Sequence, residues 1–557
     1  MKTISTNTIY CSLFFIVVAI YCLFTAHYGF ETWDTGYIPS FSWRIANGQD
    51  VYKDFVYKAP PSTLYFQAIF IKTLPVAAQF YYIKIVNYLL FALQVFLAVK
   101  SFTNFYPLPF KFNKWALMTV GFVISLLNFT AYPWPTTDGL LFAVIALYVL
   151  SLSRNGKSSI LQLLAIAFFC LLSALTKQSF YLIPFGFFLV IACMQGIKKG
   201  VQFLAFLLVF ISLFFLWINY TSSINDFLEQ TTGQTHFKDL LYSGFLDYVW
   251  TYPKASFLLP LIILLAYLLL YFPKKKAITF PEYLKNLSIV LLVVSIALCV
   301  FREFLIASRI AMLSATFAVI SKIIKDRNNF RYYIPILLTL LIAWSCSISM
   351  GYNYPIFFST GIILSLTILF SEDLDKVYNP KLFILGGSII LLLAYSSNFR
   401  PYREKQISEL NYPLDAVSPK LKYLKTNKDN RNKLLDLKSL VEKYGNRYIV
   451  APSFPMAHYV FNTQSVLPAD WLTNNEVNRD PSRFLKIASE KENFIFLEKS
   501  FLYGSEEFMF DKKEDFSVIA VYIYKNFKKI DETRHFIIYN TIEKNEEFPV
   551  IARKSVH

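Results

Sequence analysis

The chain has few charged residues for its length. Of its 557 residues only 16% are Asp, Glu, Lys or Arg, whereas 55% are hydrophobic and 18% are aromatic. An ordinary soluble protein carries about 25% charged residues, and a soluble chain of this length needs polar surface to cover several cores. Disorder is also excluded, because long Leu, Ile and Phe runs oppose solvation. The composition therefore predicts a polytopic membrane protein.

Several common functional motifs are missing as well. The chain has no P-loop, GxSxG or HExxH motif, so ATP-driven and protease chemistry have no support. All six cysteines fall inside apolar segments without metal-ligand spacing, so no structural disulfide is expected. His236 and His458 have no companions at ligand spacing and are interpreted as surface histidines. No internal repeat is evident.

Long apolar runs are abundant, and runs of about 20 residues predict spanning helices. About thirteen candidates centre near residues 10–27, 79–99, 115–131, 139–153, 159–175, 180–195, 201–219, 255–272, 286–301, 304–322, 333–350, 355–370 and 381–396. The first run is long and no A-x-A site follows it, so we expect a retained helix rather than a signal peptide.

The net charge of +17 does not indicate nucleic-acid binding, because most Lys and Arg of the first 400 residues lie in the short loops between these runs. Alternate loops are rich in basic residues, and the positive-inside rule places them in the cytoplasm. They hold Lys111, Lys114, Arg154, Lys157, Lys198, Lys199, Lys274, Lys275, Lys276, Lys285, Lys325, Arg327, Arg331, Lys376 and Lys381. The N-terminus is then cytoplasmic, and an odd number of crossings leaves the tail outside.

The predicted fold class is an α-helical polytopic membrane protein with a small C-terminal extracytoplasmic α/β domain. Residues 1–396 form the membrane domain, with a first outer loop at about 28–75, and residues 397–557 form the tail domain. In the tail, helical patterns alternate with four strand-like runs, RYIVAPSF, NFIFLE, FSVIAVYIY and HFIIYNTI. In the first outer loop, Ile38–Ile45 and Pro61–Ile71 read as short amphipathic helices on the membrane.

Asp34 stands in this loop between Trp33 and Thr35, near the outer end of the first helix. A carboxylate walled by aromatic side chains at that depth is partly desolvated and suited to act as a base. The alternative is that Asp34 caps an interfacial helix. Asp138, in YPWPTTDGLL, begins the fourth helix on the same side. It is either a helix cap or a second acidic residue that positions an acceptor or holds a metal ion.

Three basic residues lie near the outer ends of apolar helices. Lys177 follows the fifth helix, where a lone lysine either snorkels or meets an anion. Arg302 lies in an outer turn and Arg309 about two turns into the next helix. A buried arginine needs a partner, which is either a carboxylate such as Glu303 or a phosphate.

These features together resemble a known superfamily. The chain combines an Asp after the first helix, the run WRIANGQDVYKDF, the run APPSTLYF and a later LTK. It resembles the GT-C superfamily of polyprenyl-phosphate-sugar-dependent glycosyltransferases, in the branch of protein O-mannosyltransferases and the lipid A aminoarabinose transferase. By topology the resemblance covers about the first 400 residues, and its motifs concentrate in residues 28–75.

The resemblance implies roles for particular residues. Asp34 would be the general base for an acceptor hydroxyl that attacks the sugar with inversion. Lys177, with Arg302 or Arg309, would neutralise the departing lipid phosphate, and Lys58 is a further phosphate candidate. Asp138 would have a supporting role.

The chain departs from the family pattern at one position. Many relatives carry adjacent acidic residues in the first loop, whereas Asp34 is followed by Thr35. Glu31, three residues earlier, meets Asp34 if the segment forms one helical turn. The departure leaves a divalent metal requirement unassigned.

The expected function is an inverting hexosyl- or pentosyltransferase of cell envelope glycosylation in the bacterial inner membrane. Its expected partners are a polyprenyl-phosphate sugar, membrane lipids, and a lipid, polysaccharide or protein acceptor, with the tail periplasmic or extracellular. A transporter or lipid flippase is the alternative, although that class typically shows internal repeats and helices broken near the midplane. A scaffold or receptor that displays the tail leaves Asp34, Asp138 and Lys177 unexplained.

Overall fold

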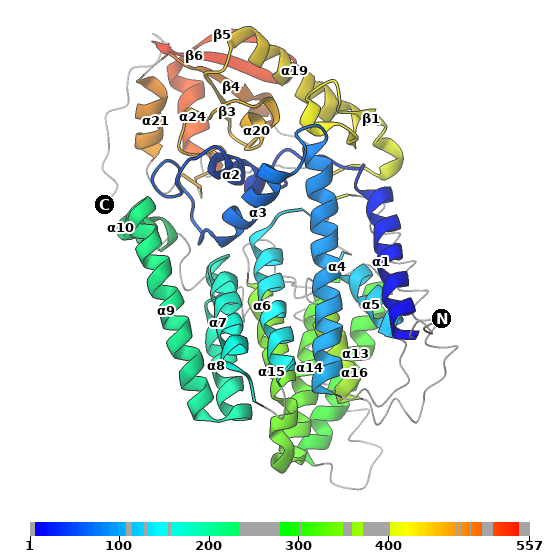
Figure 1. Cartoon of the computed structure of the whole chain (residues 1–557). Helices are drawn as coiled ribbons and strands as arrows, with labels where there is room; N and C mark the ends of the chain where they lie inside the picture. The colour runs from blue at the N-terminus through cyan, green and yellow to red at the C-terminus, as the bar shows by residue number, and fades with distance from the viewer. Residues whose placement is uncertain are drawn as a thin grey trace, which may run out of the picture. The chain divides into compact units, whose positions relative to one another are not determined.

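The computed structural model describes residues 6–106, 114–126, 132–153, 157–232, 279–300, 304–348, 359–370, 401–474, 476–477, 481–490, 492–503 and 516–544. Contacts divide the chain into two compact units. The helical unit comprises Met1–Phe24, Ile85–Phe214 and Thr235–Arg400, and the loop–tail unit comprises Thr25–Lys84, Phe215–Gln234 and Pro401–His557. Figure 1 labels the elements of both.

The helical unit is built from apolar helices, three of which, α1, α4 and α9, have one end in the loop–tail unit. They are α1 (Thr6–Thr25), α4 (Gln79–Phe105), α5 (Lys114–Ser125), α6 (Pro135–Ser151), α7 (Ile160–Ala174), α8 (Leu182–Gln195), α9 (Ile197–Thr221), α13 (Phe280–Val300), α14 (Phe304–Lys325), α15 (Phe330–Ser347) and α16 (Ser359–Leu369). Within the described residues, six helices are long and apolar enough to cross a membrane, and four shorter helices are also apolar.

These helices account for most of the predicted spans. Of the thirteen predicted segments, 255–272 and 381–396 lie outside the described residues, and the other eleven coincide with helices. The predicted fold class is confirmed in its main parts, a polytopic set of apolar helices and a small C-terminal α/β region. The total of about thirteen crossings stays a prediction.

Small residues let neighbouring helices of this unit pack closely. The Ser288 hydroxyl on α13 donates to the Ser314 carbonyl on α14 at 2.7 Å, and the Ser314 hydroxyl donates back to the Ser288 carbonyl at 2.7 Å. Gly186 on α8 faces Leu341 of α15 so closely that a Cβ there would lie 2.4 Å from its side chain. Such contacts suit membrane helices, which associate by packing and interhelical hydrogen bonds rather than by exclusion of water.

The loop–tail unit combines short helices with two small sheets. Its helices are α2 (Tyr37–Ala46), α3 (Ser62–Thr73), α10 (Ile224–Thr231), α19 (Lys428–Tyr444), α20 (Ala457–Phe461), α21 (Pro481–Ser489), α22 (Lys499–Tyr503) and α24 (Val518–Asn526). Its strands are β1 (Tyr412–Pro413), β2 (Lys425–Thr426), β3 (Tyr448–Ala451), β4 (Phe494–Glu498), β5 (Phe527–Glu532) and β6 (Phe536–Lys544). The 3₁₀ helices described in the whole chain are Gln178–Phe180, Arg327–Asn329, Ile407–Glu409 and Pro419–Leu421.

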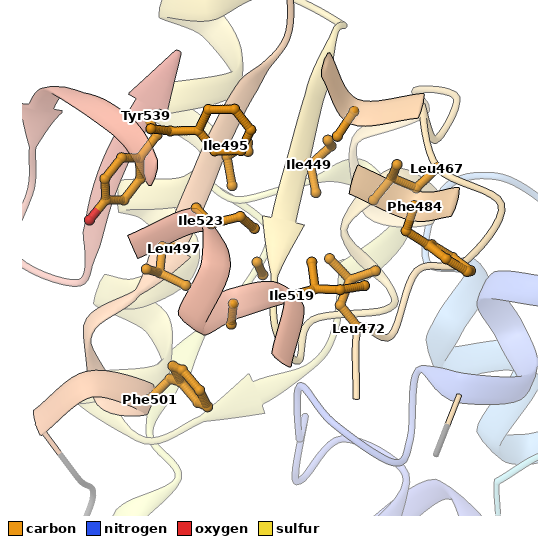
Figure 2. Packing of buried hydrophobic residues seen from close by; sticks show 14 of the residues in the cluster. Ile449, Leu467, Leu472, Phe484, Ile495, Leu497, Phe501, Ile519, Ile523 and Tyr539 are labelled. Atoms are coloured by element: carbon orange, nitrogen blue, oxygen red, sulfur yellow. The ribbon is translucent and has the colours of Figure 1, made fainter. Parts of the chain in front are cut away.

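The larger sheet has the strand order β3-β4-β6-β5. Strands β3 and β4 are parallel, whereas β4 with β6 and β5 with β6 are antiparallel. Helix α24 covers one face, and Figure 2 shows Ile519 and Ile523 of this helix among Ile449, Ile495 and Leu497 of the strands. This cluster is the hydrophobic core of the α/β region.

Three of the four predicted strands are confirmed, because RYIVAPSF and NFIFLE contain β3 and β4, and HFIIYNTI covers most of β6. The strand predicted for FSVIAVYIY is wrong, since this run forms α24. The Ser517 side chain caps that helix by accepting a hydrogen bond from the Ala520 N–H at 3.1 Å. Ile519, Ala520 and Ile523 are buried on one helical face. Strand β5 was not among the predicted runs.

The first outer loop is part of the same packed unit as the tail. Its predicted helices are present as α2 and α3, but α2 contacts both α3 and α20, and eight of its residues are buried. Val56 lies in the hydrophobic cluster of the tail, and its N–H donates to the Pro468 carbonyl at 2.8 Å. Helix α2 is therefore covered by protein rather than lying on a membrane surface. The predicted boundary at residue 397 stays a prediction.

A buried ion pair joins α2 to the tail. Arg44 Nε and Nη2 donate to the two carboxylate oxygens of Asp470, each at 2.7 Å, and the Arg44 side chain is only 5% exposed. Nη2 also donates to the Leu467 carbonyl at 2.7 Å. Burial acts to raise the pKa of Asp470, but the charge and hydrogen bonds of Arg44, with smaller contributions from His458 and Ser465, together hold it below its usual range.

Arg44→Met is expected to lower the free energy of unfolding of the loop–tail unit by about 3–5 kcal/mol, because it leaves the Asp470 carboxylate buried without its cation. Lys53→Met is the control, since Lys53 pairs with Asp50 at 3.6 Å on an exposed part of the same loop. Denaturant unfolding of the purified chain measures both. Equal stability of the two variants would show that the Arg44 pair does not hold this unit together.

Candidate functional site

Asp34 lies in the turn that precedes α2, and its side chain points into the loop–tail unit. Its Oδ2 accepts a hydrogen bond from the Tyr402 hydroxyl at 2.7 Å and lies 3.1 Å from Nη1 of Arg403. Both partners belong to the segment that begins the tail. The residue is buried. This arrangement places a carboxylate between a hydroxyl donor and a cation, away from bulk water.

Glu31 organises the turn that carries Asp34. One carboxylate oxygen accepts from the Trp33 N–H at 2.7 Å, and the other accepts from the N–H groups of Asp34 at 2.8 Å and Thr35 at 3.1 Å. Helix α2 has Gly36 at its N-cap and no side-chain capping bond. Asp34 therefore does not cap α2, which was the alternative considered for it, and Glu31 accepts the N–H groups of the turn before the helix. The Asp34 side chain faces the tail segment instead.

The two carboxylates share one cation. Arg403 Nη1 lies 3.1 Å from Asp34 Oδ2 and 3.9 Å from Glu31 Oε1. Burial raises the pKa of Glu31 to about 7, with a further rise from the Asp34 charge, and Arg403 opposes both. Burial also raises the pKa of Asp34, against the lowering effects of Arg403 and then Lys58. The pair therefore titrates closer to neutral pH than ordinary carboxyls do.

The tail segment is anchored to the first loop on both sides of Arg403. Gly29, with a φ of +87°, sits so close to Pro401 that a Cβ on it would lie 2.9 Å from the proline Cβ. Glu404 is buried and accepts hydrogen bonds from the Phe30 N–H at 3.0 Å and the Asn427 amide at 2.8 Å. Arg403 itself has a φ of +52°, a left-handed conformation that costs an L-residue roughly 1–2 kcal/mol.

Tyr402 and Arg403 were not predicted from the sequence. They follow the last predicted span, in the run FRPYREKQ, on the side where Asp34 was expected. A basic residue directly after the outer end of an apolar run is unusual under the positive-inside rule, and this is the signal that could have singled out Arg403.

Lys58 lies in the same unit, where it forms an ion pair with Glu476, and the Tyr37 hydroxyl donates to the other oxygen of that carboxylate at 2.9 Å. Because Lys58 is among the causes that lower the pKa of Asp34, the lysine acts on the candidate base electrostatically. Of the predicted phosphate-binding residues, Lys58 belongs to the loop–tail unit, together with Asp34 and Glu31.

Asp138 belongs to the helical unit. It lies in the first turn of α6 and is only 2% exposed, while Trp134 occupies the N-cap position without a side-chain capping bond. Its backbone N–H donates to the Trp134 carbonyl at 3.1 Å. Asp138 is thus inside the helix rather than at its cap, near the positive end of the helix dipole, where a carboxylate is stabilised.

The remaining predicted cations also belong to the helical unit. Lys177 donates from Nζ to the Ile348 carbonyl at 2.8 Å, and Ile348 is the C-cap of α15. The lysine therefore meets the negative end of a helix dipole. Arg309 is buried on α14, and Arg302 lies outside the described residues. Their roles as phosphate ligands stay predictions.

Among the described residues, no group of three His, Cys, Asp or Glu side chains is placed to hold a metal ion. His458, which was expected at the surface, is instead buried, where it stacks on Tyr448 and shares a hydrogen bond with Thr463 at 2.9 Å. Burial lowers the pKa of His458 to about 4, so the ring is neutral at physiological pH. It is a packed core residue.

Gly29→Ala is expected to destabilise the loop–tail unit by about 1–3 kcal/mol, because the new methyl group must push Pro401 away and the left-handed φ is strained. Gly48→Ala is the matched control, since Gly48 has a φ of +85° but nothing within 4 Å of the added atom. Comparing the unfolding of the two variants isolates the contact with Pro401. A loss no larger in Gly29→Ala than in Gly48→Ala would contradict close docking of the tail segment.

No protein-family model matches the chain, and no curated protein matches it. The chain is similar to the crystal structure of ArnT from Cupriavidus metallidurans in the apo state, at 12% identity and a TM-score of 0.42, over 97% of this chain and 99% of that one. It is also similar to the crystal structure of ArnT from Cupriavidus metallidurans bound to undecaprenyl phosphate, at 10% identity and a TM-score of 0.40, over 96% and 98%.

Proposed function

We propose that this chain is an inverting membrane glycosyltransferase that moves a sugar from a polyprenyl-phosphate donor to an acceptor hydroxyl on the outer face. The observation that carries the proposal is the buried Asp34 carboxylate, held by Tyr402 and Arg403 in the loop directly after the first apolar helix. A desolvated carboxylate with a raised pKa is suited to accept a proton near neutral pH. The sequence resemblance supplies the reaction class.

Asp34 is proposed as the general base. Its free oxygen accepts the proton of the acceptor hydroxyl while the hydroxyl oxygen forms a bond to the anomeric carbon. The bond from that carbon to the phosphate oxygen breaks, and the lipid phosphate leaves with the electron pair. Because attack and departure occur on opposite faces of the sugar, the anomeric configuration inverts. Glu31 keeps the Asp34 turn in shape through its three backbone hydrogen bonds.

The departing phosphate requires positive charge, because stabilising developing charge is usually the largest electrostatic contribution to such a reaction. Lys58 is the proposed contributor from the loop–tail unit, where it already acts electrostatically on Asp34. From the sequence resemblance we also propose Lys177, Arg302 and Arg309 as phosphate ligands, and Asp138 as a supporting acidic residue.

The donor class follows from the side of the membrane on which the site is proposed. Nucleotide sugars are made in the cytoplasm, whereas a lipid-linked sugar presents its headgroup at the outer face with its tail among apolar helices. We therefore propose a hexosyl or pentosyl donor carried on a polyprenyl phosphate, and an acceptor that is a lipid, a polysaccharide or a protein. The proposed location is the bacterial inner membrane, with a cytoplasmic N-terminus and a periplasmic tail.

Asp34→Asn is expected to lower transfer of radiolabelled sugar from a polyprenyl-phosphate-sugar extract to membrane acceptors by about 10²–10⁴-fold, because the amide keeps the shape but does not accept the proton. Asp50→Asn is the matched control, since Asp50 lies in the same loop and is partly exposed. Equal transfer by the two variants would remove Asp34 from the reaction. A wild-type protein that transfers no label would contradict the proposed activity.

A further inference from the structure

Three consecutive side chains, Tyr402, Arg403 and Glu404, connect the start of the tail to the candidate base. Tyr402 and Arg403 contact Asp34, and Glu404 contacts the backbone of the first loop. We propose that this segment, called here the charge-setting segment, keeps Asp34 ionised beside Glu31: Arg403 supplies the counter-charge and Glu404 is the positioning residue that holds it. The inference deepens the proposed function and rests on it.

Glu404 is held by a dense set of donors. Besides the Phe30 N–H and the Asn427 amide, the Thr426 hydroxyl donates to its carboxylate, and the Asn430 amide lies within 3.4 Å. Asn430 in turn donates to the Phe30 carbonyl at 3.0 Å. The backbone just before Glu31 is thus tied through Glu404 to the start of α19. A carboxylate that accepts this many hydrogen bonds is fixed in place.

The same stretch of the first loop is held from a second direction. Lys84, near the start of α4 and 2% exposed, donates from Nζ to the carbonyls of Tyr28 at 2.6 Å and Gly29 at 3.2 Å. The Gly29 N–H also donates to the Lys425 carbonyl at 2.9 Å. The peptide groups on both sides of Gly29 are therefore fixed. Because Pro401 packs directly on Gly29, the Arg403 backbone has little freedom to move away from Asp34.

The contacts of Pro401 and Glu404 hold the Arg403 backbone in a strained conformation. Its left-handed φ of +52° is uncommon for a residue with a long side chain. Such strain persists only where surrounding contacts over-determine the conformation, and it gathers at functional sites. Here those contacts are the packing of Pro401 and the hydrogen bonds of Glu404. The strained backbone carries an arginine side chain that is 26% exposed and whose guanidinium is in ion-pair range of both carboxylates.

The charges around the carboxylate pair are unevenly distributed. Arg403 is the cation in direct contact, and Lys58 acts on Asp34 from the first loop while paired with Glu476. Lys433 approaches the Thr32 hydroxyl at 3.5 Å but forms its ion pair with Glu498. The Tyr402 hydroxyl donates to Asp34 without adding charge.

Within the part of the chain that the structure describes, one contacting cation therefore serves two buried carboxylates. If the guanidinium is removed, both carboxylates lose their nearest positive charge, and the pair retains a proton at higher pH. Glu31 keeps its three backbone N–H donors, which favour its ionised form. Part of the retained proton stays on Glu31, whose pKa burial already raises to about 7. Asp34 loses its closest cation, so its own proton affinity also rises and it is protonated in a larger share of the molecules at a given pH. A protonated Asp34 is unable to accept the proton of the acceptor hydroxyl.

The first test measures protonation without requiring transfer. Dicyclohexylcarbodiimide reacts with protonated carboxyl groups in apolar surroundings, and mass spectrometry of the peptide that contains Glu31 and Asp34 gives the labelled fraction at each pH. In Arg403→Gln the pH at which labelling falls to half is expected to rise by about one unit or more, a tenfold change in proton affinity. Arg403→Lys keeps the charge, so its labelling midpoint is expected to lie close to that of the wild type.

Glu404→Gln separates positioning from simple charge. If Glu404 acts on Glu31 and Asp34 only through its charge, removing that negative charge lowers the proton affinity of the pair. If Glu404 positions Arg403, the variant instead loosens the guanidinium, and the labelling midpoint rises as in Arg403→Gln. Tyr402→Phe retains the cation and is expected to shift the midpoint less than Arg403→Gln does. Thermal unfolding of each full-length variant shows whether it is folded before labelling.

A midpoint in Arg403→Gln equal to that of the wild type would overturn the inference. A downward shift of the labelling midpoint in Glu404→Gln would also overturn it. An increase in donor KM in Arg403→Gln without a shift of the labelling midpoint would overturn it too, and would make Arg403 a donor-phosphate ligand instead. In transfer assays the inference predicts that the acid limb of kcat moves to higher pH in both variants. Unchanged transfer by Asp34→Asn would refute the proposed function while leaving the labelling result intact, so the two failures are distinguishable.

Discussion

The fold of the loop–tail unit depends on giving each buried charge an ionic or hydrogen-bonding partner from a distant part of the sequence. Arg44 and Asp470 are 426 residues apart, and Asp34 and Tyr402 are 368 apart. An unpaired buried charge is costly, whereas a paired and hydrogen-bonded one is tolerated. Neither the first loop nor the tail supplies both members of these pairs. The two segments therefore form one unit, and the candidate base acquires its hydroxyl donor and its cation only when the tail has folded against the loop.

Local pattern was sufficient to predict the apolar helices and three strands, because each depends on a continuous run of hydrophobic residues. It failed at FSVIAVYIY, since Val, Ile and Tyr favour strands while Ile519, Ala520 and Ile523 also share a helical face. The N-cap at Ser517 and packing against the sheet decided in favour of the helix. The burial of α2 was not predictable either, because an amphipathic helix looks the same whether protein or lipid covers it.

At the candidate site, sequence reasoning found the two carboxylates but not the groups that control them. Asp34 was predicted from its place beside Trp33 near the outer end of the first helix, and Glu31 because it stands three residues earlier. Tyr402 and Arg403 were missed because nothing local indicates which distant segment will reach the loop. Lys177 was recognised as an unusual outer cation, yet its partner is the Ile348 carbonyl. Backbone acceptors are present at every residue, so a partner of that kind leaves no sequence signature.

The carboxylates of the candidate site come from the first loop and their cation from the tail, and this has a chemical consequence. A base made from one loop alone takes its proton affinity from local burial, which in a low-dielectric setting favours the neutral acid. Here the counter-charge comes from the first residues of the tail, on a backbone held between Gly29 and Glu404. Small movements of that segment change the distance from the guanidinium to two carboxylates at once. The proton affinity of the base is therefore set by how the tail is anchored as well as by the loop that bears it.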